Sequence, residues 1–497
     1  MLTPDRNALI EKALAIAPTQ AYIGGRWRAS SSGATFDVHN PATGQVLTSV
    51  TDATPDDGMA ALDAACAAQD EWAATAPRAR SELLRAAFDR VHELGDEFAA
   101  LMTLEMGKPL AESASEVAYG AEFLRWFAEE AVRVNGRYTA SPEGNLRILT
   151  VKRPVGPALF ITPWNFPLAM ATRKIAPALA AGCTTILKPA ALTPLTALAF
   201  AQVCHEVGIP AGVVNVVPTA EARPVTGPLI ADPRLRKLSF TGSTQVGVAL
   251  LREASTNVLR TSMELGGNAP FIVFEDADLP AAVEAARATK LRNIGEACNA
   301  ANRFYVQRSV ADEFARALAS DFETLTLGDG LAEGTDIGPI VSDDQRSHID
   351  DLVQAAVDDG ASVLVGGRPQ PGPGWFYPPT VVTDLDANAD LVTNEIFGPV
   401  APIVAFDTED EVLALANAST MGLQGYVHTA DLDRALRMTE RLEVGMIGIN
   451  SPTISNAAAP FGGVKHSGLG REGGSEGVEE YLETIYVGLP DPFRHHR

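Results

Sequence analysis

The chain has 497 residues, of which 46% are hydrophobic and 20% are charged, a composition typical of a globular protein with room for two or three domains. The formal net charge of −23 argues against nucleic acid and anionic membranes as partners, because binding to either depends on cationic side chains that neutralise phosphate. Four cysteines without paired spacing favour a reducing compartment, and the eight histidines show no ligand spacing, so no metal site is predicted.

The N-terminal segment lacks the apolar core of a signal peptide. The most membrane-like stretch, residues 155–171, contains three prolines and an asparagine, so a spanning helix is not expected there. These features predict a cytoplasmic protein.

The first part of the chain has a helical pattern. Apolar residues recur at intervals of three and four in residues 56–74 and 79–107, and Gly107 with Pro109 is expected to end the second helix. Residues 145–156 then alternate apolar and polar side chains, as an exposed strand does.

From residue 155 onward, short β-rich runs such as "TTILKP" and "KLSFTG" alternate with helical segments. This βαβα order predicts a mostly parallel sheet with helices on both faces. A second α/β series begins near "APFIVF" and ends near "MIGIN". The C-terminal "YLETIYVGL" is strand-like again and can pair with "LRILTVKRP", so the chain is predicted to have two α/β lobes and a small strand extension for assembly.

Cys298 differs from the other three cysteines, Cys66, Cys183 and Cys204, whose apolar surroundings indicate packing. Its segment, "NIGEACNAANR", has the composition of a loop or a helix start. A helix N-terminus would lower the pKa of the thiol and favour the thiolate. Cys298 is therefore a candidate nucleophile, and an inert thiol is the alternative.

Two further residues suit catalysis. Glu264 ends an apolar strand directly before two glycines, a position that suits a general base, although a surface glutamate before a turn would have the same pattern. Asn165 lies between prolines in "TPWNFP", which would hold its amide rigidly as a donor to an oxyanion. The alternative for Asn165 is a proline-rich turn without catalytic function.

A nucleotide site is indicated without the usual G-x-G-x-x-G fingerprint, which the chain lacks. In "KLSFTGSTQVG" a strand leads through Gly242 and Ser243 into a helix, whose first N–H groups would face a phosphate. Lys188 ends a neighbouring strand, where ligands of parallel sheets bind.

Seven motifs occur in the order in which they are found in the aldehyde dehydrogenase superfamily: "TPWNFP", "ILKPA", "SFTGSTQVG", "MELGGNAP", "GEAC", "EIFGPV" and "PFGGVKHSGLGRE". The chain resembles this superfamily from about residue 20 to 490, and within it most resembles the NADP-linked succinate-semialdehyde dehydrogenases. The resemblance implies an α/β fold with a Rossmann-like cofactor domain (residues 15–138 and 159–265), a catalytic domain (266–450) and oligomerisation strands (139–158 and 482–495). A homodimer or homotetramer is implied.

The resemblance also implies a covalent mechanism. Cys298 would attack the aldehyde carbon, and the Asn165 amide with the Cys298 backbone N–H would hold the resulting oxyanion. Glu264 would activate the water that releases the carboxylic acid. Lys174 and Glu472 match a proton-relay pair of the family, with a structural ion pair as the alternative.

The implied cofactor is NADP, with NAD as the alternative. The family positions for it fall on Thr162, Trp164, Lys188, Ala191, Gly242, Ser243, Leu265, Glu395 and Phe397. Lys188 and Glu395 would hold the two riboses. Ala191 stands where NAD-preferring relatives usually carry a glutamate, which removes a carboxylate that would repel a 2′-phosphate. It also lacks the hydroxyl that NADP-linked relatives often have there.

For the substrate, the resemblance places Arg173, Arg292 and Ser455 around the distal carboxylate of a semialdehyde. Two guanidinium groups can bind a carboxylate through charge-assisted hydrogen bonds even on an acidic protein. The predicted reaction is therefore oxidation of a carboxylate-bearing semialdehyde, first of all succinate semialdehyde, to the diacid.

Three positions depart from the family pattern. Glu296 replaces a glutamine and would raise the pKa of the thiol if its carboxylate faced it. Leu291 replaces an aromatic residue, which would widen the pocket and makes glutarate semialdehyde an alternative substrate. Ala300 replaces the second cysteine of a redox switch. A non-acidic aldehyde substrate, a cofactor-independent thiol esterase and a non-catalytic scaffold are the remaining alternatives.

Overall fold

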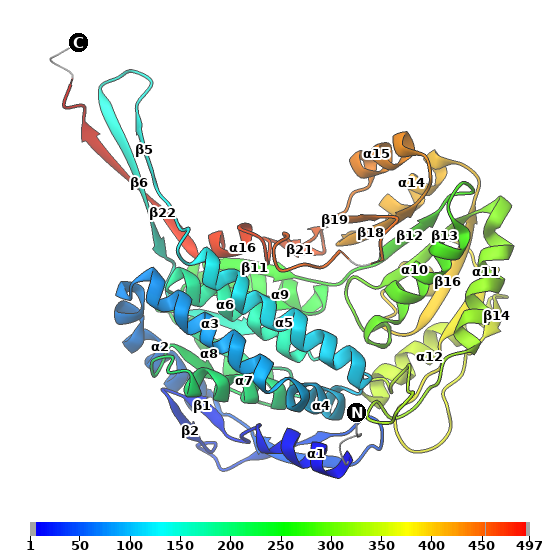
Figure 1. Ribbon diagram of the computed structural model, residues 1–497, viewed down its shortest axis with the longest axis horizontal. Helices are drawn as coiled ribbons and strands as arrows, with labels where there is room; N and C mark the ends of the chain where they lie inside the picture. Colours follow the sequence, from blue (N-terminus) through cyan, green and yellow to red (C-terminus); the bar gives the residue numbers. More distant parts are fainter. Residues whose placement is uncertain (1–5, 453, 494–497) are drawn as a thin grey trace.

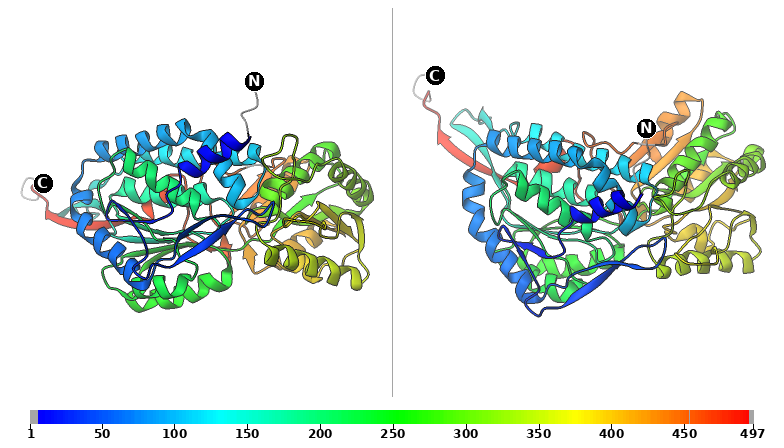
Figure 2. Two further views of the ribbon diagram at one scale, coloured as in Figure 1. Left: turned by 90° about the horizontal axis from the view of Figure 1, so that it is seen from below. Right: turned by 60° about the horizontal axis from the view of Figure 1, so that its bottom comes forward.

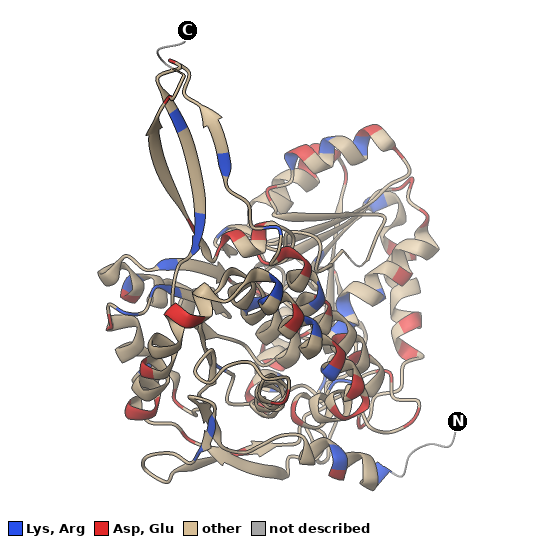
Figure 3. Ribbon diagram, turned by 60° about the vertical axis from the view of Figure 1, so that its left-hand side comes forward, with Lys and Arg blue, Asp and Glu red and all other residues tan. Residues whose placement is uncertain are grey.

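The computed structural model describes residues 6–452 and 454–493. Two α/β lobes lie side by side, and a three-stranded arm projects from the first of them (Figure 1). Acidic residues are scattered over the helices of both lobes, and the arm carries several basic residues (Figure 3). None of the helices in the described part of the chain is both long and apolar enough to cross a membrane.

The first lobe is built on an eight-stranded sheet in the order β2-β1-β9-β8-β7-β10-β11-β21. Its strands from β9 to β11 run parallel, and the strands at both edges run antiparallel to their neighbours. The bounds are β1 (Ala21–Ile23), β2 (Arg26–Arg28), β7 (Ala158–Ile161), β8 (Thr185–Lys188), β9 (Val214–Val216), β10 (Lys237–Thr241), β11 (Arg260–Glu264) and β21 (Gly468–Leu469).

Helices cover both faces of this sheet, as the βαβα order predicts. Alternate residues of β7 point into two separate cores, with Phe160 in one and Leu159 in the other, because successive side chains of a strand point to opposite faces. The helices are α1 (Arg6–Ala15), α2 (Pro55–Ala74), α3 (Pro77–Glu93), α4 (Gly95–Met106), α5 (Leu110–Glu130), α6 (Pro167–Ala181), α7 (Leu195–Glu206), α8 (Ala222–Ala231), α9 (Thr244–Ala254) and the short η1 (Ser255–Asn257). The single helix predicted over residues 79–107 is two helices that meet at Leu94, and Gly107, with φ 102°, ends α4.

The second lobe contains a seven-stranded sheet in the order β14-β15-β16-β13-β12-β18-β19, parallel except for β14. The bounds are β12 (Ala269–Val273), β13 (Ala301–Gln307), β14 (Ser362–Val365), β15 (Thr380–Thr383), β16 (Val400–Phe406), β18 (Gln424–His428) and β19 (Met446–Ile449). Its helices are α10 (Leu279–Leu291), η2 (Arg292–Gly295), α11 (Arg308–Glu323), α12 (Asp343–Asp358), α13 (Asp390–Thr393), α14 (Glu409–Asn417) and α15 (Leu432–Arg441).

The arm consists of β5 (Arg137–Ala140), β6 (Leu146–Pro154) and β22 (Leu482–Pro490) and stands away from both lobes (Figure 2). β22 pairs antiparallel with β6 along its whole length, which confirms the pairing predicted for these two segments. Residues 494 and 495, the end of the predicted C-terminal strand segment, lie outside the described residues. The remaining elements are β3 (Thr35–His39), β4 (Val46–Thr51), β17 (Met421–Gly422), β20 (Val464–Lys465) and α16 (Glu476–Glu479).

Candidate active site

A cavity of about 330 Å3 lies between the lobes, at the carboxyl ends of the parallel strands of the first sheet. Ligands of parallel sheets bind at this edge. The first lobe contributes Pro163, Trp164, Asn165, Thr241, Gly242, Ser243, Leu265 and Gly266, and the second contributes Cys298, Gln345, His348, Glu395 and Phe397. The cavity therefore brings six of the nine predicted cofactor residues together with two of the predicted catalytic residues.

The other three cofactor positions, Thr162, Lys188 and Ala191, follow the ends of β7 and β8 but do not line this cavity. The Thr162 N–H donates to the Lys188 carbonyl oxygen, 3.2 Å away. Lys188 is 7% exposed, burial lowers its pKa to about 8, and its ammonium has no ion-pair partner within residues 6–452 and 454–493. A buried cation without a counter-charge fits a site for an anionic ligand.

Further features of this cavity fit a dinucleotide. α9 begins directly after Gly242 and Ser243, so its first N–H groups face the cavity wall, where they can meet a phosphate. Glu395 accepts a hydrogen bond from the Gly267 N–H at 3.0 Å, and a Cβ atom at Gly266 would lie 2.7 Å from the other carboxylate oxygen. A glycine at position 266 is therefore what allows Glu395 to occupy this place.

Cys298 lies in the loop between η2 and β13, and no helix begins there. Of the two structures that the composition predicted for this segment, a loop or a helix start, the loop is found, and the lowered thiol pKa expected at a helix start does not apply. Burial raises the pKa of the Cys298 thiol to about 12, with a further increase from Glu395 and opposing effects of Arg173 and Arg292. The thiol is protonated at neutral pH, so a neighbouring base must take its proton before it can act as a nucleophile.

The Asn165 residue is held by hydrogen bonds to the loop that carries Cys298. Its Nδ2 donates to the Glu296 carbonyl oxygen at 2.9 Å, and Asn293 Nδ2 donates to the same oxygen and to the Asn165 carbonyl oxygen. Turning the Asn165 amide over would place two oxygens against each other, so this orientation is fixed. The second Nδ2 proton remains for a carbonyl oxygen bound beside Cys298.

Glu264 ends β11, as predicted, and is 3% exposed. Both of its carboxyl oxygens lack a hydrogen-bond partner among the described residues. Burial raises its pKa well above the ordinary value, and the charge of Glu472 raises it further. A carboxyl group with a raised pKa is a stronger base once it is ionised, which suits it to activate water.

Lys174 and Glu472 form a buried ion pair with 2.5 Å between Nζ and Oε1, and Lys174 also donates to Ser239 at 2.9 Å. Arg173 joins the same carboxylate, with its Nε 2.7 Å from Oε2. Burial by itself would raise the pKa of Glu472, but Lys174 and Arg173 hold it below the ordinary value. The ion pair is thus present, and the proton-relay role of these two residues stays a prediction.

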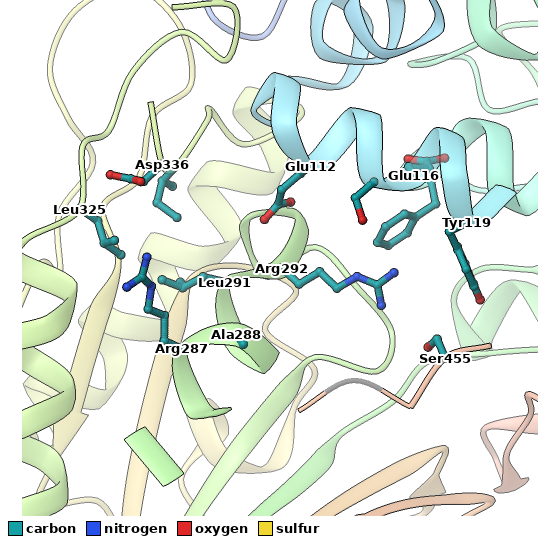
Figure 4. A pocket seen from close by; sticks show the side chains of 13 residues that line it. Glu112, Glu116, Tyr119, Arg287, Ala288, Leu291, Arg292, Leu325, Asp336 and Ser455 are labelled. Carbon is teal, nitrogen blue, oxygen red and sulfur yellow. The ribbon is translucent and has the colours of Figure 1, made fainter. Parts of the chain in front are cut away.

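A second cavity, of about 490 Å3, lies beside the first and contains the predicted substrate residues Arg292 and Ser455 (Figure 4). Phe166, which follows Asn165, lines this cavity, while Asn165 lines the first. The Arg292 guanidinium lies 5.1 Å from the centre of the Phe166 ring and has no ion-pair partner in the described part of the chain. The Ser455 hydroxyl accepts a hydrogen bond from Asn299, the neighbour of Cys298, at 3.2 Å.

Arg173 does not line this second cavity. Its guanidinium packs 4.1 Å from the centre of the Phe461 ring while it contacts Glu472, but its Nη2 is buried without a hydrogen-bond partner among the described residues. Arg173 and Arg292 both lower the pKa of Cys298, which places both positive charges near the thiol.

The carboxyl group of Glu296 is turned away from this chemistry, since its Oε1 accepts from the Val341 N–H at 3.2 Å. Burial raises the pKa of Glu296 well above the ordinary value, which disfavours its charged form. Ala300 is buried close to the nucleophile and supplies no second thiol.

The sequence did not identify the residues that hold Asn165 in place. Lys108 and Asn293 donate to its carbonyl oxygen, and they in turn contact Glu116 and Glu112. Lys108 indicated only a helix end in "EMGKPL", and the two glutamates have the spacing of an ordinary helix surface. No local pattern distinguishes a buried ion pair in such a segment from exposed charges.

The chain matches the profile of the Aldehyde dehydrogenase family over residues 27–487. A succinate-semialdehyde dehydrogenase of Paenarthrobacter nicotinovorans is 60% identical over 448 residues, which are 90% of this chain and 100% of that protein. A glutarate-semialdehyde dehydrogenase of Pseudomonas aeruginosa is 47% identical over 470 residues, 95% of this chain and 97% of that protein. Among solved structures, an Escherichia coli NADP dependent enzyme has a TM-score of 0.94 at 46% identity, and the match covers 96% of this chain and 99% of that one.

The match spans nearly the whole chain in both sequence and fold, and it covers the relatives' own lengths almost completely. It confirms the family and the fold that the seven motifs predicted. The chain belongs to the aldehyde dehydrogenase family.

Proposed function

We propose that this aldehyde dehydrogenase oxidises a semialdehyde with a distal carboxylate to the diacid, with succinate semialdehyde as the preferred substrate. The observation that carries the proposal is the Arg292 guanidinium, which is unpaired among the described residues and lies in the cavity beside Cys298. On a chain with a net charge of −23, an unpaired guanidinium at this place supplies the local attraction that a carboxylate needs. Ser455 provides a hydroxyl in the same cavity.

In the proposed mechanism, ionised Glu264 takes the proton of the Cys298 thiol, and the sulfur attacks the aldehyde carbon. The free Nδ2 proton of Asn165 and the Cys298 N–H donate to the oxygen as it becomes negative. Bound NADP would be held by Lys188, Gly242, Ser243 and Glu395 and would supply the acceptor for the hydride of this carbon, after which the substrate would remain on Cys298 as a thioester. Once Glu264 has released this first proton to solvent, it removes a proton from the water that attacks the thioester, and the diacid leaves with regeneration of the Cys298 thiolate.

We infer NADP as the preferred cofactor, with NAD as the alternative. Lys188, Gly242, Ser243 and Glu395 would hold it, and the absence of a carboxylate at Ala191 favours a 2′-phosphate. The solved relative described as NADP dependent supports this inference. Residues 15–138 and 159–265 would form the nucleotide-binding domain and residues 266–450 the catalytic domain.

Residues 139–158 and 482–495, which include the arm, would serve assembly into a homodimer or homotetramer in the cytoplasm. Three paired strands that stand away from the lobes present an unpaired sheet edge, and a second copy of the chain is a natural partner for such an edge. The oligomeric state in solution, measured by light scattering, tests this part of the proposal. A monomeric protein would contradict it.

Glutarate semialdehyde is the second candidate substrate. Leu291 lines the substrate cavity, where a smaller side chain than an aromatic one leaves space for one more methylene group. The similarity to a glutarate-semialdehyde dehydrogenase supports this alternative.

The test is a panel of succinate semialdehyde, glutarate semialdehyde and butanal, each with NADP and with NAD, followed by the absorbance of the reduced cofactor. We expect the largest kcat/KM for succinate semialdehyde with NADP. A higher value for butanal would contradict carboxylate recognition, and no reduction of either cofactor would contradict the proposed reaction.

A further inference from the structure

Lys108 is a buried lysine that contacts Asn165, which lines the first cavity, and Phe166, which lines the second. It lies between α4 and α5 and is 1% exposed. Its Nζ is 2.5 Å from Glu116 Oε2, donates to the main-chain oxygen of Asn165 at 2.8 Å and lies 4.3 Å from the centre of the Phe166 ring. An ammonium group is costly to bury unless it is paired and hydrogen-bonded. Here the ammonium contacts Asn165 and Phe166 directly, and its ion-pair partner is Glu116.

Glu116 extends this contact to the next element. Its other carboxylate oxygen accepts hydrogen bonds from the N–H groups of Leu168 and Ala169, at 2.9 and 3.1 Å. These residues belong to the first turn of α6, which begins directly after Asn165 and Phe166. The Lys108–Glu116 pair therefore holds this segment from two sides, at the carbonyl of Asn165 and at the start of α6.

The Asn165 residue is fixed by two donors and one acceptor. Its carbonyl oxygen accepts from Lys108 and from Asn293, and its side-chain amide donates to Glu296. Removing Lys108 would leave the carbonyl oxygen with the Asn293 contact alone. An amide that stabilises an oxyanion must be held in place before the reaction, because a displacement of about 1 Å can cost a hundredfold in rate.

We propose that Lys108, together with Glu116, is a positioning residue that orients the Asn165 amide toward the oxygen of the bound carbonyl group. The proposal rests on the proposed function only in so far as Asn165 is the oxyanion donor. It applies equally to cofactor-free ester hydrolysis at Cys298, which needs the same donor but neither the semialdehyde nor NADP.

The test uses the double variant Lys108→Met/Glu116→Gln. Removing one partner of a buried pair leaves an uncompensated charge, whereas changing both avoids this loss, and the amide oxygen of the introduced glutamine can still accept from the start of α6. We expect a thermal midpoint close to that of the parent protein. For p-nitrophenyl acetate hydrolysis, and for semialdehyde oxidation, we expect kcat to fall about 10- to 100-fold while KM changes little.

The matched control is Lys237→Met/Glu480→Gln. Lys237 is also buried, lies 3.3 Å from a glutamate and packs over an aromatic ring, but it begins β10, at the strand end opposite to the cavity. We expect this control to keep the parent kcat. Equal losses of kcat in both double variants would overturn the proposal, because they would report a general effect of removing buried charge.

A double-mutant cycle with Asn165→Ala separates positioning from an independent effect. If Lys108 acts through Asn165, Lys108→Met/Glu116→Gln lowers the esterase kcat in the parent protein and not in the Asn165→Ala protein. Additive losses, or an unchanged kcat in the Lys108→Met/Glu116→Gln protein, would overturn the proposal. Failure of the proposed function would appear separately, as absent semialdehyde oxidation by a parent protein in which the esterase cycle still shows the coupling.

Discussion

The cavity that contains Cys298 and the cavity that contains Arg292 are built in different ways. One wall of the cavity proposed for the cofactor consists of residues that directly follow parallel strands of the first sheet, and the rings of Trp164 and Phe397, which both line it, lie at 90° to each other with 5.3 Å between centres. The cavity proposed for the substrate is assembled from α5, α10 and the loop near Ser455, which are far apart in the sequence. The position of the first cavity follows from the order of the strands, whereas the second cavity depends on individual side chains from separate segments.

The charged groups around the thiol also shift its pKa in opposite directions. Glu395, on the cofactor side, and Glu264 raise the pKa of Cys298, whereas Arg173 and Arg292 lower it. Removing one of these acidic groups and removing one of these basic groups are therefore expected to change the reactivity of the Cys298 thiol in opposite directions. The following variants test that difference, from the largest expected effect to the smallest.

Replacing Cys298 by Ser removes the thiol that is the proposed nucleophile. Because a serine hydroxyl is a far weaker nucleophile without a strong base, we expect aldehyde oxidation to fall by about 10^4-fold or more. Steady-state reduction of NADP measures it, and Cys204→Ser, at a buried thiol in α7, is the control. A serine variant as fast as the parent protein would contradict covalent catalysis.

Replacing Glu264 by Gln removes the base proposed for both the attack of Cys298 and the hydrolysis of the thioester, so steady-state reduction of NADP should fall by about 10^2- to 10^4-fold, the usual contribution of a general base. If turnover continued at the parent rate, another base would have to act.

The same variant should be more stable at neutral and alkaline pH. The pKa of Glu264 is higher in the folded chain than its ordinary value of 4.5, so the folded state loses stability as the pH rises above 4.5 and through the folded pKa. Glutamine removes this loss, and thermal midpoints of the two proteins should converge below pH 4.5, where the carboxyl is protonated in both states. A difference that does not depend on pH would contradict this explanation.

Replacing Arg292 by Leu should raise KM for succinate semialdehyde about 10- to 100-fold, which corresponds to one lost charge-assisted hydrogen bond, and should affect butanal much less. Arg287→Leu is the matched control, since Arg287 lines the same cavity but already contacts Asp321 at 3.4 Å. Equal effects of Arg292→Leu on the charged and the neutral aldehyde would exclude a carboxylate contact.

Replacing Glu395 by Gln should lower the pKa of the thiol, because it removes the charge that most raises it after burial. The rate of alkylation by iodoacetamide, followed against pH, should rise at lower pH than in the parent protein. The difference should be confined to the range above about pH 7, since the pKa of Glu395 is raised to about 7 by burial and the group is uncharged below it. Glu395→Asp, which keeps the charge, is the control.

The sequence predicted the cofactor side more completely than the substrate side. Glu264, Gly242 and Ser243 follow β-rich runs whose order fixes where the strands end, so parallel topology alone brings them to one edge. Arg292 and Ser455 were predicted through the resemblance, and nothing in the local pattern placed Glu112, Tyr119 or Arg287 in the same cavity.

The surroundings of Cys298 were not predictable from composition. The composition of this polar, glycine-containing segment allowed either a loop or a helix start, and the structure has a buried loop, before which Asn293 and Ile294 have positive φ angles of 53° and 61°. The Asn293 N–H donates to Glu112 and the Asn293 side-chain amide donates to the Asn165 carbonyl oxygen, and contacts between segments so far apart in the chain cannot be predicted from a single stretch of sequence.

The connection between β11 and β12 has a practical consequence for redesign. A Cβ atom at Gly267 would lie 2.1 Å from the main-chain oxygen of Cys298, so any side chain there would push the reactive sulfur out of place. Attempts to broaden the range of substrates for synthesis therefore cannot use substitutions at Gly267. Leu291 and Leu325 are better positions, because they line the cavity that contains Arg292 and do not line the one that contains Cys298.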